Sequence, residues 1–203
     1  FYGVPLLTNS KGVYTNAVYG FINMMLGFFK KQEPMYAAVA FDVSKKVFRH
    51  EKYADYKGTR KGMPEELAEQ MPILKEILRS MNIAILEKEG YEADDIIGTV
   101  VKKAEENNIA SIILTGDKDS LQLISELTEV YLTKKGISQT QKMDLAALAE
   151  EYGLNPAQIC DLKGLMGDSS DNIPGVVGVG EKTALKLLRE YHDVENLYAH
   201  AEE

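Results

Sequence analysis

Short, largely apolar runs alternate with longer segments of helical periodicity through the first two thirds of the chain. The runs are 37–41, 83–86, 109–114 and 130–132. A run of this kind is typical of a strand buried on both faces, as in a parallel sheet. Strands that alternate with helices imply right-handed crossovers between parallel strands. The sequence therefore predicts an α/β fold with a parallel-sheet core and helices on both faces.

The intervening segments place apolar residues at helical spacing. Pro64, followed by two glutamates, is typical of a helix start, and Pro72 in the same apolar stripe predicts a kink or a junction of two helices. After residue 132 only helical segments follow, and no convincing strand is found. The predicted helices are 17–30, 64–81, 92–106, 120–124, 144–152, 156–166, 181–191 and 194–200.

The length of 203 residues fits one domain with a small helical appendage. We expect a core at 1–140 and a helical region at 141–203. Cys160 is the only cysteine, which excludes an internal disulfide and fits a reducing compartment. The apolar stretch Phe21–Phe29 is much shorter than the roughly 18 residues that span a bilayer, so we expect no membrane association.

The formal net charge is −8, but one segment has the opposite sign. Between residues 44 and 61, seven basic residues stand against two acidic ones. His50, Tyr53 and Tyr56 are interleaved with them. Basic side chains mixed with aromatic rings are typical of a surface that follows a nucleic-acid backbone and stacks on bases. The composition of this segment alone fits a solvated loop equally well.

Four acidic clusters follow predicted strands or open predicted helices: Asp42, 92–95, 117–119 and 168–171. The carboxyl ends of strands are where open α/β sheets bind ligands. Clustered carboxylates with few histidines favour Mg²⁺ or Mn²⁺ over zinc. Two such ions about 3.5 to 4 Å apart can clamp the attacking and leaving oxygens of a phosphodiester. Calcium storage and a structural acidic patch are the alternatives that the residues alone leave open.

A glycine-rich run, 173–184, leads directly into a predicted helix. Glycines allow a backbone to approach phosphate closely, and a helix N-terminus offers free N–H groups. Lys182 adds a positive charge. We interpret the run as the hairpin of a helix-hairpin-helix element, which grips duplex backbone without reading sequence.

Four motifs occur in order along the chain: Tyr91–Asp95, Thr115–Asp119, Met166–Gly175 and Gly178–Ala184. Together they resemble the 5' nuclease domains of bacterial DNA polymerases I, members of the flap endonuclease superfamily. The resemblance covers essentially the whole chain. It implies a PIN-like parallel-sheet core, a flexible basic helical arch at about 43–64, and a helical C-terminal region with a helix-hairpin-helix (helix-three-turn-helix) element.

The resemblance also implies the roles of individual residues. In the family the acidic clusters bind two divalent metal ions, Mg²⁺ or Mn²⁺, and the hairpin can hold K⁺ through backbone carbonyls. Lys57 and Arg60 are expected to contact the scissile phosphate, and Tyr56 to stack on a base. The implied metal ligands are Asp42, Glu92, Asp94, Asp95, Asp117, Asp119, Asp168 and Asp171; the implied catalytic residues are Lys57, Arg60, Asp42, Asp94 and Asp119; the implied DNA-binding residues are Arg49, Tyr56, Lys57, Arg60, Gly175, Gly178, Gly180, Lys182 and Thr183.

The function implied by the resemblance is that of a structure-specific 5' nuclease, with 5'-3' exonuclease and flap endonuclease activity. Its expected partners are 5' flaps, nicked or gapped duplex and RNA primer–DNA junctions, in replication and repair in the bacterial cytoplasm, at the nucleoid. We expect a monomer whose chain can also carry a polymerase domain. A PIN-type ribonuclease and a non-catalytic DNA-structure-binding paralogue are the alternatives.

The family's first strand carries an Asp-Gly pair with a metal-binding aspartate. In this chain, Phe1–Pro5 resembles the sequence just after that pair. We therefore expect one further strand, and one further carboxylate ligand, upstream of Phe1.

Overall fold

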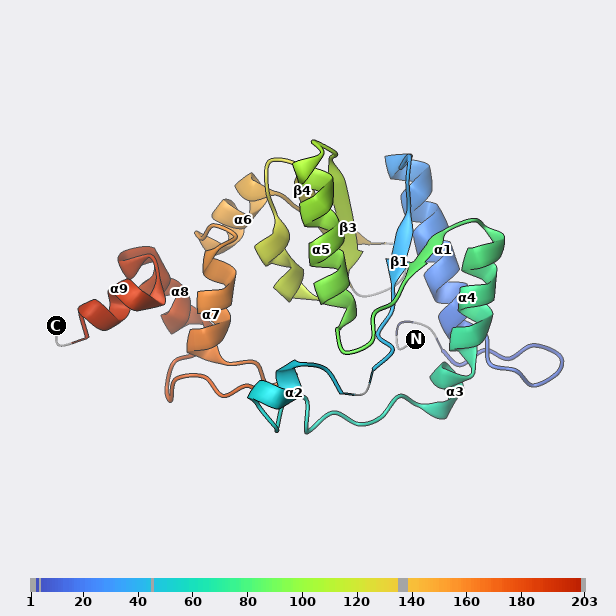
Figure 1. Cartoon of the computed structure of the whole chain (residues 1–203), viewed down its shortest axis with the longest axis horizontal. Helices are drawn as coiled ribbons and strands as arrows, with labels where there is room; N and C mark the ends of the chain where they lie inside the picture. Colours follow the sequence, from blue (N-terminus) through green and yellow to red (C-terminus); the bar gives the residue numbers. More distant parts are fainter. Residues whose placement is uncertain (1–2, 4, 45, 135–138, 202–203) are drawn as a thin grey trace. The chain divides into compact units, whose positions relative to one another are not determined.

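The computed structural model describes residues 3, 5–44, 46–134 and 139–201. The chain forms two compact units, each assembled from separate stretches of sequence (Figure 1). Unit 1 contains Phe1–Lys45, Lys61–Ile96 and Thr133–Gln141. Unit 2 contains Lys46–Arg60, Ile97–Leu132 and Lys142–Glu203. The boundary expected at residue 140 stays a prediction.

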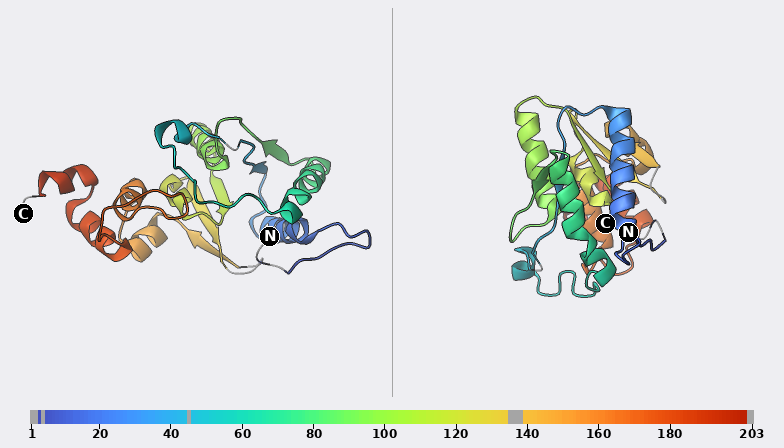
Figure 2. Two further views of the ribbon diagram at one scale, coloured as in Figure 1. Left: turned by 90° about the horizontal axis from the view of Figure 1, so that it is seen from below. Right: turned by 90° about the vertical axis from the view of Figure 1, so that its right-hand side faces the viewer.

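Unit 1 packs two helices on a small parallel sheet. Strands β1 (Ala38–Ala40) and β2 (Ala84–Leu86) pair in parallel, as the sequence predicts. Helices α1 (Asn16–Gln32) and α4 (Gln70–Ser80) lie side by side (Figure 2). The apolar core between these elements contains Met25, Leu74, Leu78 and Ile83, with Phe21, Phe29, Val39, Phe41 and Ile85 packed against it.

Two helices meet near Pro72, but the junction lies before the proline. Helix α3 (Glu65–Ala68) ends at Glu69, and α4 begins at Gln70. Pro72 therefore occupies the first turn of α4, where a missing N–H is tolerated.

Helix α1 is capped by a residue that is distant in sequence. Thr15 makes no side-chain cap bond. Instead, the fully buried Gln70 accepts hydrogen bonds from the backbone N–H groups of Ala17 and Val18, at 2.7 and 3.2 Å. Its amide nitrogen donates to Asn16 and to the Glu66 carbonyl. The start of α1 is thus fixed by α4 rather than by its own cap residue.

A three-stranded sheet has the order β3 (Ser111–Thr115), β4 (Thr128–Thr133) and β5 (Thr140–Met143), and β3 and β4 are parallel. β5 corrects the prediction that no strand follows residue 132. Its sequence, Thr-Gln-Lys-Met, is largely polar, and a buried-strand pattern does not detect it.

Helix α5 (Ala93–Glu106) begins in unit 1 and continues into unit 2. The core of unit 2 combines sheet and helical residues and includes Val130, Met143, Leu148 and Leu188, all with 0% exposure. The predicted C-terminal helices are confirmed as α6 (Leu145–Tyr152), α7 (Gln158–Met166), α8 (Glu181–Tyr191) and α9 (Val194–Ala199).

The segment expected to form the arch, 43–64, contains one short helix among its described residues, α2 (Arg49–Lys52). Val47 and Tyr56 in this segment are buried, at 4% and 5% exposure. The base of the segment is therefore packed against protein. Its expected flexibility stays a prediction.

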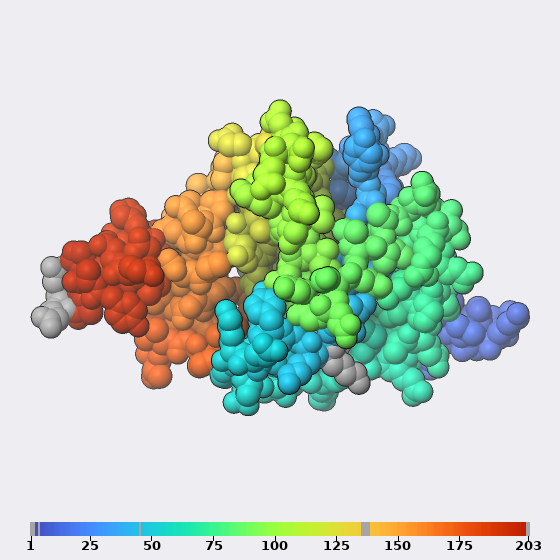
Figure 3. All heavy atoms as spheres, in the orientation of Figure 1, coloured from blue at the N-terminus to red at the C-terminus, as the bar shows by residue number. Residues whose placement is uncertain are grey.

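The loop before α1 projects from the rest of unit 1 (Figure 3). An isolated antiparallel bridge between Thr8 and Tyr14 closes it. Where the chain is described, no helix combines the length and the apolar character that a membrane span needs.

Candidate functional site

Two of the predicted metal ligands of unit 1, Asp42 and Asp95, bind the start of α5. Asp42 follows β1, and its Oδ1 accepts a hydrogen bond of 2.7 Å from the backbone N–H of Ala93. Asp95 reaches back one turn, and its Oδ2 accepts from the backbone N–H of Glu92 at 2.9 Å. Both carboxylates therefore satisfy N–H groups at the positive end of the helix dipole. Asp94, in the same turn, is exposed.

In unit 2, Asp117 and Asp119 follow β3, as predicted. The short helix expected at 120–124 is a 3-10 helix, η1 (Lys118–Leu123), which begins two residues earlier. Asp117 caps it, because its Oδ1 accepts from the backbone N–H of Asp119 at 2.9 Å. The Asp119 carboxylate lies against Lys163 of α7 (Gln158–Met166).

Lys163, in the last turn of α7, connects two of the predicted metal ligands. Its Nζ lies 2.7 Å from Asp119 Oδ1 and 2.7 Å from Asp168 Oδ2. The contact with Asp168 is a hydrogen bond, whereas Asp119 Oδ1 is a buried atom without an aligned hydrogen-bond donor. The contact with Asp119 is therefore an ion pair of poor hydrogen-bond geometry. Within unit 2, the structure thus brings together Asp119 and Asp168, which are 49 positions apart in the sequence.

The surroundings of these two carboxyl groups shift their pKa values in opposite directions. Burial raises the pKa of Asp119, and its acidic neighbours Asp117 and Asp168 add to this, against the effect of Lys163. Burial also acts to raise the pKa of Asp168, but hydrogen bonds from Lys163 and Ser170 outweigh it and hold that pKa well below its usual range. Burial acts to lower the pKa of Lys163, and the two carboxylates more than reverse this.

The Asp171 side chain contacts the base of the predicted arch, while its backbone N–H donates to Asp168 Oδ1 at 3.2 Å. Oδ2 of Asp171 accepts a hydrogen bond of 2.9 Å from the Tyr56 hydroxyl, and its Oδ1 lies 2.5 Å from Arg60 Nη2. Lys57 Nζ is 3.9 Å from Oδ2. The structure thus brings three of the predicted DNA-binding residues to one predicted metal ligand.

Tyr56 does not present its ring in the way that base stacking requires. The side chain is 5% exposed, and its hydroxyl is bound to Asp171. The sequence pattern of basic and aromatic residues could not reveal this, because the partner lies 115 positions away. In this conformation Tyr56 binds the Asp171 carboxylate, which does not favour stacking on a base. The stacking stays a prediction.

The glycine-rich run joins α7 to α8 as a loop, as the helix-hairpin-helix interpretation requires. A pair of backbone hydrogen bonds between Asp168 and Ile173 begins it. Gly175 packs on backbone, because a Cβ there would lie 2.3 Å from the Met166 carbonyl carbon. Gly178 has a φ of 83°, whereas a Cβ on Gly180 would meet nothing within 4 Å. Gly175 therefore has a packing role, while Gly180, Lys182 and Thr183 are exposed.

The donor chemistry of these carboxylates fits a hard divalent cation. All the predicted ligands are carboxylates, and one oxygen, on Asp119, is buried without an aligned donor. The Lys163 ammonium between Asp119 and Asp168 marks a position that stabilises positive charge. Within the described parts of the chain, however, no three Asp, Glu, His or Cys side chains are already grouped closely enough to hold a metal ion. The sharing of metals by the acidic groups stays a prediction.

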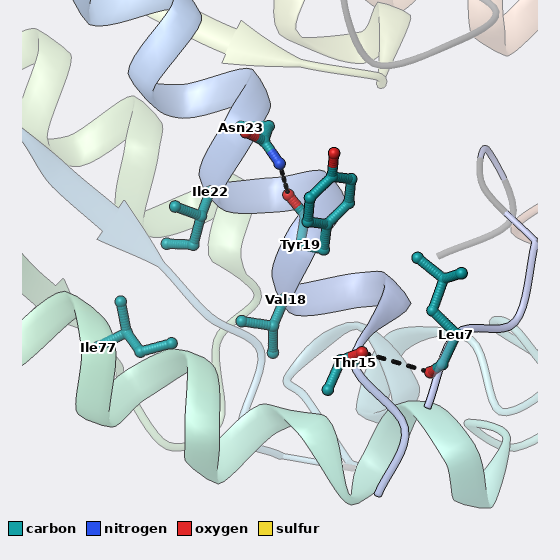
Figure 4. A pocket seen from close by; sticks show the side chains of 7 residues that line it. All are labelled: Leu7, Thr15, Val18, Tyr19, Ile22, Asn23 and Ile77. Atoms are coloured by element: carbon teal, nitrogen blue, oxygen red, sulfur yellow. Dashed lines mark hydrogen bonds between the residues drawn. The ribbon is translucent and has the colours of Figure 1, made fainter. Parts of the chain in front are cut away.

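A pocket of about 320 Å³ in unit 1 is not part of this candidate site. It is lined almost entirely by apolar groups from α1, α4 and the preceding loop, and none of the predicted site residues lines it (Figure 4). Two of the residues that line it are joined by a hydrogen bond, because the Asn23 side-chain amide donates to the Tyr19 carbonyl.

Sequence reasoning did not identify Lys163 as part of the site. The one available signal is a basic residue in the last turn of a predicted helix, just before an acidic loop. This signal is not specific, because basic residues are common in the last turn of helices, where they complement the helix dipole. Asn172, whose side chain donates to the Asp55 carbonyl at 2.8 Å, was likewise not recognised as a contact of the arch base.

Two family models together match the whole chain. Residues 1–153 match the 5'-3' exonuclease N-terminal resolvase-like domain, and residues 154–203 match the 5'-3' exonuclease C-terminal SAM fold. The chain is 51% identical to DNA polymerase I of Bacillus caldotenax over 203 residues, which is all of this chain and 23% of that protein. The chain thus spans less than a quarter of the length of this relative.

Among solved structures, the chain is similar to the T5 5'-exonuclease described with bound divalent zinc, with a TM-score of 0.75 and 24% identity over 90% of this chain and 70% of that one. It is also similar to a variant of the bacteriophage T5 D15 flap endonuclease described as a pseudo-enzyme-product complex with DNA and metal ions. There the TM-score is 0.74 and the identity 23%, over 90% of this chain and 70% of that one. These similarities show the fold.

Proposed function

The chain belongs to the 5'-3' exonuclease family, and from this premise we propose that it is a structure-specific 5' nuclease that hydrolyses DNA near single-strand/duplex junctions. The observation that carries this proposal is the pair of carboxylates, Asp119 and Asp168, held on either side of one cationic group after β3. Paired hard ligands of this kind support metal-assisted phosphodiester hydrolysis better than calcium storage or a structural acidic patch.

The proposed cofactors are two divalent ions, Mg²⁺ or Mn²⁺. Bound ions lower the pKa of a water molecule and neutralise charge on the leaving oxygen. The ligands would be the residues expected from the sequence: Asp42, Glu92, Asp94, Asp95, Asp117, Asp119, Asp168 and Asp171. The T5 5'-exonuclease, described with bound divalent zinc, supports the proposal of a divalent metal. We choose Mg²⁺ or Mn²⁺ because all the proposed ligand atoms are carboxylate oxygens, with no nitrogen or sulfur.

Lys57 and Arg60 provide the positive charge for the substrate phosphate. Both belong to the segment packed against the 168–172 loop. The loop holds the Lys57 backbone through the Asp171 carbonyl and the Arg60 side chain through the Ser170 carbonyl. Preorganised donors that face developing charge contribute about 3 to 4 kcal/mol each to the stabilisation of a transition state. The backbone hydrogen bond from Lys57 N–H to the Asp171 carbonyl, at 2.8 Å, supports this positioning role.

The loop between α7 and α8 would hold the duplex part of the substrate. Its glycine-rich segment and the exposed first turn of α8 suit contacts with the phosphate backbone, which fix position without reading bases. K⁺ held by backbone carbonyls of this loop is part of the proposal. The proposed substrates are 5' flaps, nicked or gapped duplex and RNA primer–DNA junctions, bound by a monomer in the bacterial cytoplasm.

Cleavage of a labelled 5'-flap DNA with Mg²⁺ tests the proposal. The assay compares this chain with a longer version that carries the upstream strand expected from the family, each with and without Asp119→Ala. Cleavage that Asp119→Ala abolishes is the expected result. Single-stranded RNA of the same length tests the PIN-type ribonuclease. Binding of the flap without cleavage in either version would favour the non-catalytic paralogue.

A further inference from the structure

The base of the basic segment is held to the loop after α7 by a set of contacts that we name the arch-base latch. It joins residues 55–60 to residues 170–172. The part that reaches backbone carbonyls consists of the Lys57 N–H donating to the Asp171 carbonyl at 2.8 Å and the Asn172 side-chain Nδ2 donating to the Asp55 carbonyl at 2.8 Å. Its side-chain part consists of Tyr56 and Arg60 on the Asp171 carboxylate.

The latch occupies both oxygens of Asp171. Oδ2 accepts from the Tyr56 hydroxyl, and Oδ1 is paired with the Arg60 guanidinium. Arg60 is further fixed by a hydrogen bond of 3.0 Å from its Nε to the Ser170 carbonyl. A residue proposed as a metal ligand is therefore engaged by a residue proposed as a phosphate contact.

The two side-chain contacts of the latch differ in how readily they can open. Tyr56 is buried, and its ring makes an edge contact with His50 at a centroid distance of 5.4 Å. The Arg60 side chain is 47% exposed, so water can replace the carboxylate as its partner. Release of Arg60 therefore leaves the buried anchor and the backbone hydrogen bonds intact.

A divalent cation on Asp171 and the Arg60 guanidinium carry the same sign of charge and need the same oxygens. We propose that Arg60 and a divalent cation compete for the Asp171 carboxylate, so that metal binding releases Arg60 toward substrate phosphate. By reciprocity, a phosphate that takes up Arg60 strengthens metal binding at Asp171. Tyr56 is a positioning residue in this scheme, because it keeps Asp171 in place when Arg60 leaves.

This inference rests on the proposed function, and its test uses no DNA and no cleavage. Binding of Mn²⁺ alone is measured by titration calorimetry for the wild type, Arg60→Gln and Lys61→Gln. Lys61 is the adjacent basic residue and is not part of the latch, so it controls for the general loss of one positive charge. We expect Arg60→Gln to bind Mn²⁺ about fivefold more tightly, and Lys61→Gln to remain close to the wild type. Equal tightening in both variants, or none in Arg60→Gln, would overturn the competition.

A second measurement uses the wild-type side chain and does not depend on the folding of a variant. Modification of Arg60 by phenylglyoxal, read by mass spectrometry, is followed with EDTA and with Mn²⁺. We expect the modification rate at Arg60 to rise with Mn²⁺ while that at Arg189, which is bound to the Tyr152 carbonyl, stays constant. A rate at Arg60 that Mn²⁺ leaves unchanged contradicts the proposal. Both readouts are independent of cleavage. The competition at Asp171 can therefore be contradicted in a protein that cleaves flaps, and it can be supported in a protein that cleaves nothing.

Discussion

At the scale of single residues, the candidate site of unit 2 is organised by basic side chains that neutralise the acids. Lys163 connects Asp119 and Asp168, and Arg60 pairs with Asp171. Like-charged carboxylates close together are costly unless a cation compensates them. The motifs predicted which residues are acidic and where they occur, but not their partners, because each pairing depends on side chains far apart in sequence.

Replacement of Lys163 by Met removes the compensating charge and leaves a partly buried carboxylate without its partner. We expect Lys163→Met to lower the free energy of unfolding in EDTA by about 1.5 to 3 kcal/mol, the range for hydrogen bonds to charged groups. Mg²⁺ should recover part of the loss. The measurement is urea denaturation, with Lys186→Met, an exposed lysine on α8, as the control. Equal small losses in both variants would contradict this account.

The lowered pKa of Asp168 predicts a pH dependence of stability. The pKa of Asp168 is lower in the folded protein than in the unfolded protein, where it is about 3.9. The ionised group therefore stabilises the fold at a pH above the unfolded pKa. This contribution disappears as the pH falls toward the folded pKa. We expect the free energy of unfolding in EDTA to fall below about pH 5 in the wild type, and to fall less steeply in Asp168→Asn. Asp119, with its raised pKa, acts in the opposite sense in both proteins. If the free energy of unfolding falls equally steeply with acid pH in the wild type and in Asp168→Asn, Asp168 does not make this contribution.

At the scale of elements, Gly175 and Gly180 of the α7–α8 loop have different roles. A Cβ at residue 175 would overlap the backbone of Met166 and Gly167, whereas one at residue 180 has free space. We expect Gly175→Ala to lower the free energy of unfolding by about 1 to 3 kcal/mol, as overpacking does, and Gly180→Ala to change it by no more than about 0.5 kcal/mol.

Duplex binding then separates packing from DNA contact at this loop. If the backbone at Gly180 approaches phosphate, Gly180→Ala weakens binding of a duplex with a 5' flap without a change in stability. Thermal unfolding and fluorescence anisotropy provide the two readouts. A Gly175→Ala protein as stable as the wild type would refute the packing role.

Helices and buried strands could be predicted well from periodicity, because local patterns determine them. α8 begins and ends at the predicted residues, and β1, β2, β3 and β4 differ only at their ends. β5 escaped prediction because its residues are polar. The start of α1 depends on Gln70, 53 positions away from Ala17, and no local cap signal contains that information.

At the scale of the whole molecule, the charge is distributed unevenly. The net charge of −8 opposes a polyanion, while the segment 44–61 is basic. Binding that depends on such a segment releases counterions from DNA and weakens with salt. The sequence predicted this segment as a nucleic-acid surface, and the structure adds that its base is packed against protein in unit 2.

Arg49 provides a test of this electrostatic contact. Flap binding is measured with Ca²⁺ in place of Mg²⁺. Under this condition we expect Arg49→Gln to bind the flap more weakly than the wild type. We also expect it to reduce the slope of log K against log salt concentration by about 1, as the loss of one phosphate contact does. Lys30→Gln, a charge change of the same size in the last turns of α1, is the control and should leave the slope unchanged. Equal changes of slope in both variants would mean that net charge alone governs binding.

The central claim is that the carboxylate pair around Lys163 serves metal-dependent cleavage at a 5' flap. The most direct measurement is the Mg²⁺ dependence of flap cleavage in the version with the upstream strand, for the wild type, Asp119→Ala and Asp168→Ala. The account predicts cleavage that needs Mg²⁺, releases the 5' flap, and is lost in both variants while flap binding persists. Cleavage that survives in EDTA, or in both alanine variants, would contradict it.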